Sequence, residues 1–401
     1  MKANFIIITV MGLLFMSNFI ESQESNILDN IIKKNKDQLT PVINHPDKYE
    51  LQIIFTKINR DNADQPSLNT FSYNEIPDKY FYPASTVKFP AAVLTLEKLN
   101  DLNKERLNMF THLSIDSVYK GHVSFSKDFK NECGYPNIAN YIKQIFLVSD
   151  NESFNRLYDF LGQKEINSRL QKRGFKNTNI VHRLSVARTS KQNMETNPIN
   201  FFDKENNLIY KQAAGFDSSD VKLKLKNTIK GKGYFSSGKL VNEPKDFSQN
   251  NFFSLRDQHN LMMRIMKPEL FSKDQRFNLT EEDYAFLKKY MCMLPKESGC
   301  PKYDSTEYYD GYVKFLMFGD TKQPIPENIK IYSKSGLAYG YLTDNVYVVD
   351  EKNKIEFFLS ATIHVNENGI YNDDKYEYDE IGLPFLAELG RIIYNYEKGR
   401  R

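Results

Sequence analysis

A serine and a lysine three residues apart, Ser85 and Lys88, open an apolar stretch that reads Ser-Thr-Val-Lys-Phe-Pro-Ala-Ala-Val-Leu. Residues three apart on a helix lie one turn apart, so we expect the hydroxyl and the amine to share a face. A serine hydroxyl attacks a carbonyl well only when a base takes its proton, and a desolvated lysine can be that base. The pair therefore indicates acyl transfer through Ser85.

Spacing alone does not single out this serine. The same Ser-x-x-Lys pattern occurs at Ser117/Lys120, Ser124/Lys127, Ser219/Lys222 and Ser236/Lys239. Around Ser85, Pro83 suits a sharp entry from a strand into a helix, and the start of a helix offers free backbone N–H groups beside the hydroxyl. Pro90 fits the helix only if the helix starts late or bends.

Two further polar motifs each occur once, Ser149-Asp150-Asn151 and Lys334-Ser335-Gly336. The first falls on a tight connection between two helices, where it either points into a cleft or merely caps the helices. The second ends a strand, where the lysine either faces solvent or lines a site. Gly336 favours a site, because glycine permits close approach of another backbone.

These three motifs, in this order, resemble those of the class A β-lactamase-like serine hydrolases of the β-lactamase and penicillin-binding protein superfamily, with serine in place of threonine in the third. The resemblance implies that Ser85 becomes acylated and that Lys88 accepts its proton. It implies that Ser149 passes a proton to the leaving nitrogen.

The resemblance also implies the residues that bind substrate. Lys334 and Ser335, next to Gly336, would bind a substrate carboxylate, and Asn151 would bond the substrate amide. The backbone N–H groups of Ser85 and Leu337 would form the oxyanion hole, where negative charge develops.

One expected part of this family's machinery is missing. Class A enzymes carry a Glu-x-x-Leu-Asn pattern, after the second motif, that activates the deacylating water. Here the stretch after Val181-His-Arg-Leu reads Ser-Val-Ala-Arg-Thr from Ser185 to Thr189. Glu195 is the nearest candidate for the catalytic carboxylate, and a solvent-facing loop glutamate is the alternative. Fast deacylation is therefore in doubt.

The hydrophobic pattern predicts a fold of the α/β class in an α+β arrangement. Its elements are strands at 51–58, 329–336, 347–349 and 354–363, a less regular extended stretch at 71–81, helices at 138–145, 154–161, 255–266, 280–295 and 379–397, and a small hairpin near 231–235. The strands come from both ends of the chain, which favours one antiparallel sheet flanked by helices. The middle helices would form a second lobe, with the active site in the cleft between the two.

Two segments lie outside this scheme. Residues 1–22 have a lysine followed by an apolar run and are typical of a signal peptide, with a retained anchor as the alternative. The mature domain would be 23–401, exported to the periplasm or the medium, without a later membrane span. The gap between Asn151 and Lys334 is longer than in the family, and we place an insertion around 196–250.

The composition excludes several other classes. The net charge is +3 with basic and acidic residues interspersed, which gives no reason to expect nucleic-acid binding. The six histidines are scattered and no Cys/His spacing suggests zinc, so we expect neither a metal nor a cofactor. Of the three cysteines, Cys292 and Cys300 are close enough to pair but are at least as well explained as free thiols.

Three functions remain. The first is an exported serine hydrolase that opens β-lactams, a monomer with a small-molecule substrate. The second is the same fold acting on another amide or ester, such as a D-alanyl peptide of the cell wall. The third, a non-catalytic penicillin-binding sensor, is disfavoured because Ser85, Lys88, Ser149 and Lys334 occur together. An α/β-hydrolase is disfavoured by the absence of Gly-x-Ser-x-Gly from the sequence.

Overall fold

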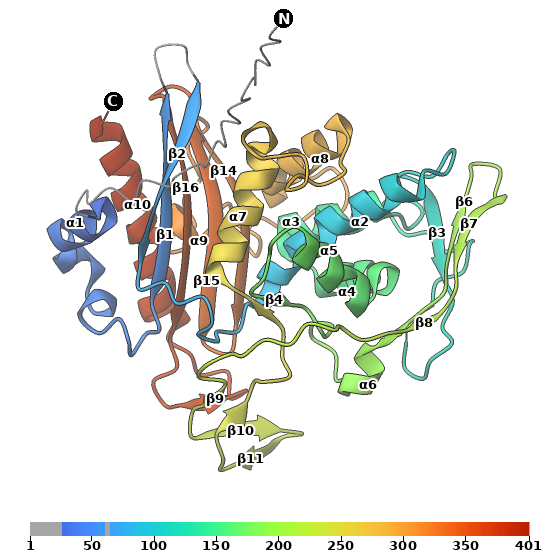
Figure 1. Ribbon diagram of the computed structural model, residues 1–401, viewed down its shortest axis with the longest axis horizontal. Helices are drawn as coiled ribbons and strands as arrows, with labels where there is room; N and C mark the ends of the chain where they lie inside the picture. Colours follow the sequence, from blue (N-terminus) through green and yellow to red (C-terminus); the bar gives the residue numbers. More distant parts are fainter. Residues whose placement is uncertain (1–25, 61–64, 123, 401) are drawn as a thin grey trace, which may run out of the picture.

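The computed structural model describes residues 26–60, 65–122 and 124–400. The predicted signal peptide, residues 1–22, lies outside them. Helices and several small sheets of two or three strands surround one five-stranded antiparallel sheet in the order β14-β15-β16-β1-β2. Its strands are β1 (Gln52–Arg60), β2 (Pro66–Tyr73), β14 (Ile329–Ala338), β15 (Tyr341–Asp350) and β16 (Ile355–His364). The predicted sheet, built from both ends of the chain, is confirmed (Figure 1).

Both faces of the central strand β16 are buried, and its alternate residues pack in different cores. Phe357 and Leu359 pack with α1 (Ile27–Lys34) and α10 (Leu383–Arg400), whereas Phe358 between them packs in the core that includes α7 (Leu255–Met266). This follows from the two-residue period of a strand. It also explains why β16 is an almost unbroken apolar run, since both of its faces are covered.

The second lobe is mostly helical, as predicted. It consists of η3 (Ala84–Val87, a 3₁₀ turn), α2 (Lys88–Leu102), α3 (Ile138–Val148), α4 (Asn151–Leu161), α5 (Gln163–Lys172) and α8 (Glu281–Cys292). Every residue of α2 from Lys88 to Glu97 is buried, so α2 is the central helix of the lobe. Because α2 begins only at Lys88, Pro90 lies in its first turn, where no N–H is needed.

Smaller elements connect these parts. They are η1 (Lys36–Leu39), η2 (Val42–Asn44), α6 (Ser190–Asn193), η4 (Pro268–Leu270), η5 (Pro295–Glu297), α9 (Phe315–Phe318) and the π-helical turn η6 (Tyr378–Gly382). Within the described ranges no helix is long and apolar enough to cross a membrane.

Several predicted boundaries need correction. The strand predicted at 347–349 is the longer β15, which begins at Tyr341, and the helix predicted to end at 295 is α8, which ends at Cys292. The extended stretch predicted over 71–81 is strand only as far as Tyr73, because Asn74 takes a left-handed φ of 50° and Pro77 lacks a donor for a ladder. The last helix begins as the π-helical turn η6 and continues as α10 to Arg400, three residues beyond the predicted end at 397.

The stretch around 196–250 forms short strands that reach both lobes. They are β5 (Glu195–Thr196), β6 (Ile199–Phe202), β7 (Leu208–Gln212), β8 (Gly215–Phe216), β9 (Ile229–Lys230), β10 (Gly233–Ser236), β11 (Lys239–Val241), β12 (Lys245–Asp246) and β13 (Phe252–Phe253). At one end, β6 pairs with β3 (His112–Ile115) and with β7. At the other, β10 pairs with β17 (Ile370–Tyr371), and β13 pairs with β4 (Thr178–Asn179) (Figure 1).

The small hairpin predicted near 231–235 is β10–β11. Its two-residue turn is Ser237-Gly238, with φ values of 49° and 77°. Two consecutive positive φ values are those of a tight hairpin turn, for which glycine is well suited.

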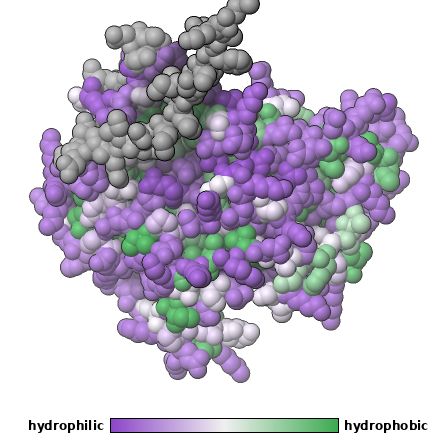
Figure 2. Space-filling view, in the orientation of Figure 1, coloured by the Kyte–Doolittle hydropathy of each residue, from purple (hydrophilic) through white to green (hydrophobic). Residues whose placement is uncertain are grey.

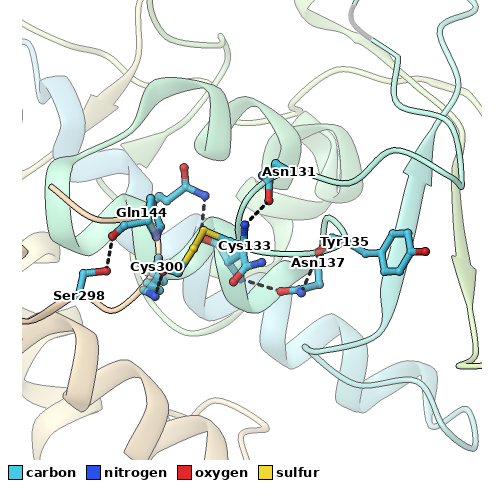
Figure 3. The surroundings of a disulfide bond; sticks show 10 residues. Asn131, Cys133, Tyr135, Asn137, Gln144, Ser298 and Cys300 are labelled. Atoms are coloured by element: carbon cyan, nitrogen blue, oxygen red, sulfur yellow. Dashed lines mark hydrogen bonds between the residues drawn. A yellow bond between two sulfur atoms is a disulfide. The ribbon is translucent and has the colours of Figure 1, made fainter.

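The cysteine pairing differs from the one considered from sequence. Cys300 is bonded to Cys133, at 167 residues' separation, and Cys292 is a free thiol. The bridge joins the segment before α3 to the segment after η5 (Figure 3). Cys292 and Cys300 are near in sequence, but α8 ends at Cys292 and the chain then turns away through Pro295. Local spacing therefore did not reveal the partner.

Candidate active site

Ser85 lies in the 3₁₀ turn η3, directly before α2, rather than on an α-helix. In a 3₁₀ turn residues three apart are eclipsed, which brings the side chain of Lys88 over that of Ser85. The Lys88 Nζ atom lies 2.8 Å from the Ser85 Oγ atom. Ala84, just before the serine, has a left-handed φ of 46°. Such backbone strain in a non-glycine residue is typical of functional sites.

The amine of Lys88 is fully buried, and its contacts fit the neutral form. Nζ donates to the backbone carbonyl of Ser149 (2.5 Å) and to Oδ1 of Asn151 (2.7 Å). In a neutral amine these two acceptors would use both hydrogens and leave the nitrogen lone pair for the Ser85 hydroxyl. Burial, and then the nearby positive charge of Lys334, hold the pKa of Lys88 well below its usual range.

Both interpretations of the Ser149-Asp150-Asn151 motif hold, for different residues. Asp150 is a helix cap, because its carboxylate accepts from the backbone N–H of Ser153 at the start of α4 (2.6 Å). Ser149 ends α3 with a left-handed φ of 58°. This turn places Ser149 and Asn151 on the side of Lys88. Ser149 Oγ lies 3.2 Å from Lys88 Nζ.

Lys334 does not face solvent. Its side chain is buried, and Nζ donates to Ser149 Oγ (2.9 Å) and to the carbonyl of Ser335 (2.7 Å). The Ser149 hydroxyl thus lies between the two lysine amines, where it can pass a proton. Burial lowers the pKa of Lys334 to about 7, against the opposing effect of the Asp344 carboxylate, which is buried behind it.

Gly336 fixes β14 against the turn that carries the serine. A Cβ atom at this position would lie 2.8 Å from both the carbonyl oxygen of Pro83 and the backbone nitrogen of Ser85, closer than real Cβ atoms approach. β14 is an edge strand of the sheet, so half of its backbone groups have no strand partner there. This edge meets the Ser85 turn, and the close approach inferred from the glycine is present.

Two hollows meet at Ser85, Asn151 and Leu337. One, of about 450 Å³, contains Ser149, Ser335 and Gly336 and a wall of three tyrosines. The other, of about 410 Å³, contains Ser185 and further tyrosines. Sequence reasoning missed mainly the aromatic residues that line these hollows and one exposed carboxylate. They are Tyr82, Tyr308, Tyr309, Tyr312, Tyr339, Tyr376, Tyr378 and Asp374. No spacing pattern marks them in the sequence.

Glu195 lies apart from these groups. It belongs to β5, its Oε2 atom lies 3.8 Å from Nε2 of His122, and its carbonyl accepts from Arg183 (2.6 Å). Glu195 lines neither hollow that contains Ser85. The side chain that the structure puts beside Asn151 is that of Ser185, whose Oγ accepts from Asn151 Nδ2 (2.8 Å).

The fold and this pair of a serine and a buried lysine are those of a serine hydrolase of the β-lactamase type. A sequence model of the β-lactamase enzyme family matches residues 34–282, and the chain belongs to this family. The comparison with curated proteins gives no significant match.

Solved structures of similar proteins have low sequence identity to this chain. PBP-A is 15% identical, with a TM-score of 0.48 over 92% of this chain and 95% of its own. A β-lactamase from Sphaerobacter thermophilus is 12% identical, with a TM-score of 0.49 over 92% and 98%. A class A β-lactamase from Clostridium kluyveri is 15% identical, with a TM-score of 0.47 over 91% and 98%.

Proposed function

We propose that this protein is an exported hydrolase that β-lactams acylate on Ser85, and that it hydrolyses the resulting acyl-enzyme slowly. The observation that carries the proposal is the contact between the Ser85 hydroxyl and the buried amine of Lys88, whose hydrogens are used elsewhere. A neutral amine in this position can take the hydroxyl proton as Oγ attacks the carbonyl carbon.

The remaining residues of the two motifs would complete acylation. As the C–N bond breaks, the leaving nitrogen needs a proton, and the Ser149 hydroxyl, in contact with both amines, can deliver one and regain it from Lys88. Lys334 and Ser335 would bind the substrate carboxylate and Asn151 the substrate amide. The backbone N–H groups of Ser85 and Leu337 would stabilise the oxyanion.

Deacylation is where this site differs from the class A pattern. A water that attacks the acyl-enzyme needs a base, and a neutral serine hydroxyl is a poor one compared with a carboxylate. Ser185, beside Asn151, offers only a hydroxyl. Glu195 stays a candidate base, although it would have to act from outside the two hollows that hold Ser85.

This same observation favours a second candidate function. A D-alanyl peptidase or related hydrolase does not need rapid turnover of a β-lactam adduct, so a hydroxyl at position 185 suits an enzyme whose natural substrate is another amide or ester. In that case β-lactams would be slow inhibitors. A non-catalytic sensor would retain the adduct and turn over no substrate.

One experiment separates these functions. The purified protein is mixed with a chromogenic cephalosporin, its hydrolysis is followed by absorbance, and the protein is analysed by intact mass spectrometry. We expect an adduct that persists for minutes or longer and is lost in Ser85→Ala. Rapid turnover would instead establish an efficient β-lactamase. If the protein shows no turnover and forms no adduct, the proposal is refuted.

We also propose export of a mature domain spanning 23–401, to the periplasm or the medium, with an insertion around 196–250. The disulfide between Cys133 and Cys300 supports this proposal, because such bonds persist in oxidising compartments. N-terminal sequencing of the protein recovered from cell fractions tests it, with the new terminus expected at Gln23. Recovery of the full chain in the cytoplasm would contradict it.

A further inference from the structure

A third cavity, of about 760 Å³, adjoins the active site. Its walls come mainly from residues 181–194, 218–225 and 248–252, so the stretch around 196–250 contributes nine of its 24 lining residues. It shares the lining residues Tyr82, Ser185 and Tyr339 with the hollow that contains Ser85. The cavity therefore extends the active site beyond the residues of the three motifs.

Hydrogen bonds hold the walls of this cavity in place. Asn251 Oδ1 accepts from the backbone N–H groups of Val181 (2.7 Å) and His182 (3.0 Å), which ties segment 248–252 to segment 181–194. Ser219 Oγ bonds Asn179 Oδ1 (2.7 Å), which ties in the third segment. These hydrogen bonds fix the three segments of the wall relative to one another.

The cavity is polar and its charge is positive. No aspartate or glutamate is among the residues that line it in the described part of the chain. Arg183 is neutralised by a buried ion pair with Asp159. Arg188 donates to two backbone carbonyls rather than to a carboxylate, and Lys222 is exposed with no ion pair to a described residue. Nearby Asp220 pairs with Lys164 instead (3.9 Å).

The arrangement around Ser85 indicates which part of a substrate would enter. Ser149 and Ser335, which act on the leaving group and its carboxylate, line the opposite hollow. Ser185 lies on this side, and the edge strand β14 runs past Gly336 and ends at Ala338, directly before Tyr339 at the mouth of the cavity. An exposed strand edge offers backbone groups to an extended peptide.

We propose that this cavity binds the acyl side of the substrate, as an extended amide chain that carries a carboxylate. Arg188 and Lys222 attract the carboxylate, and the neutral amide and hydroxyl side chains of the walls bond the amides. This inference rests on the proposed acylation of Ser85. It names the substrate class that the cavity favours.

Three penicillins made from one 6-aminopenicillanic acid nucleus test it. Their acyl groups are phenylacetyl, acetyl-glutamyl-alanyl and acetyl-glutaminyl-alanyl. The second-order rate constant of Ser85 acylation is measured for each by intact mass. We expect the glutamyl compound to react about two- to fivefold faster than the glutaminyl one, the size of a screened ion pair. The ratio should fall towards one in 1 M NaCl.

Charge reversal provides the matched comparison. In the double variant Arg188→Glu/Lys222→Glu, the ratio of glutamyl to glutaminyl rates should drop below one. Lys224→Glu, an exposed position two residues away that does not line the cavity, should keep the wild-type ratio. If phenylacetyl penicillin acylates Ser85 but the glutamyl and glutaminyl compounds react at equal rates, the inference about the cavity is overturned and the proposed function stands. Failure of all three to acylate Ser85 would overturn the proposed function as well.

Discussion

Asn151 donates from Nδ2 to the hydroxyl of Ser185 at 2.8 Å, so a hydroxyl stands on the side of the amide away from Lys88. The backbone holds this serine there, because the N–H and C=O groups of Leu184 both bond the side chain of Asn155 at 3.0 Å. Ser185 is therefore held in the wall of the hollow of about 410 Å³ that also contains Ser85. What it lacks is the basicity of a carboxylate.

Ser185→Glu should speed deacylation by about a hundredfold, the usual contribution of a positioned general base. The decay of the acyl adduct, followed by intact mass after excess β-lactam is removed, measures this. Ser185→Gln is the matched control, since it has the same size and no basicity. If the two variants deacylate at the same rate, position 185 does not face the attacking water.

Lys88→Ala should abolish acylation, with a loss of about 10²- to 10⁴-fold in its rate, because the hydroxyl then has no base. Labelling by a fluorescent penicillin measures it, and the melting temperature shows whether the variant is folded. Lys239→Ala, at the exposed Ser236/Lys239 pair of the same spacing, should label like the wild type. Normal labelling of Lys88→Ala would refute the assigned role.

Gly336→Ala should impair acylation by at least tenfold and destabilise the protein by about 1–3 kcal/mol. The added Cβ would meet backbone atoms of Pro83 and Ser85 at 2.8 Å, and backbone cannot move aside as a flexible side chain can. Labelling rates and urea unfolding measure the two effects. Gly299→Ala is the control, since nothing lies within 4 Å of its added Cβ, and it should be nearly neutral.

Acylation should depend on pH through both lysines. Burial lowers the pKa of Lys88, so the amine acts as a base above that lowered pKa and is lost as a base when the pH falls through it. Lys334, with a pKa of about 7, loses its charge as the pH rises, and its attraction for a substrate carboxylate weakens.

The profile of kcat/KM, which reports the free enzyme, should therefore be bell-shaped for carboxylate-bearing β-lactams, with its alkaline limb beginning near pH 7. An ester substrate without a carboxylate should lack that alkaline limb. The same limb for both substrates would show that Lys334 does not act through the substrate carboxylate.

Removing the disulfide should destabilise the fold. Cys133→Ser/Cys300→Ser frees a long loop in the unfolded chain, and we expect a loss of about 2–4 kcal/mol in the free energy of unfolding, measured in urea. Reducing agent should lower the melting temperature of the wild type but not that of the double variant. A melting temperature unaffected by reduction would contradict a structural role for this bond.

Much of the fold follows from local pattern. The two-residue period of the strands and the 3.6-residue period of the helices gave most of the long elements, because each depends on neighbours in sequence. The boundary of β2 and the partner of Cys300 did not follow, because they depend on contacts made far along the chain.

The sequence by itself determined that Ser85, Lys88, Ser149 and Lys334 are chemically suited to acyl transfer, since residue type and order suffice for that. Only the tertiary structure decided which members of the motifs meet. Asp150 caps a helix, Ser149 bridges two buried amines, and Ser185 rather than Glu195 stands beside Asn151. The physical reason is that burial and distance set the proton affinity of an amine and the reach of a base, and both are properties of the folded chain.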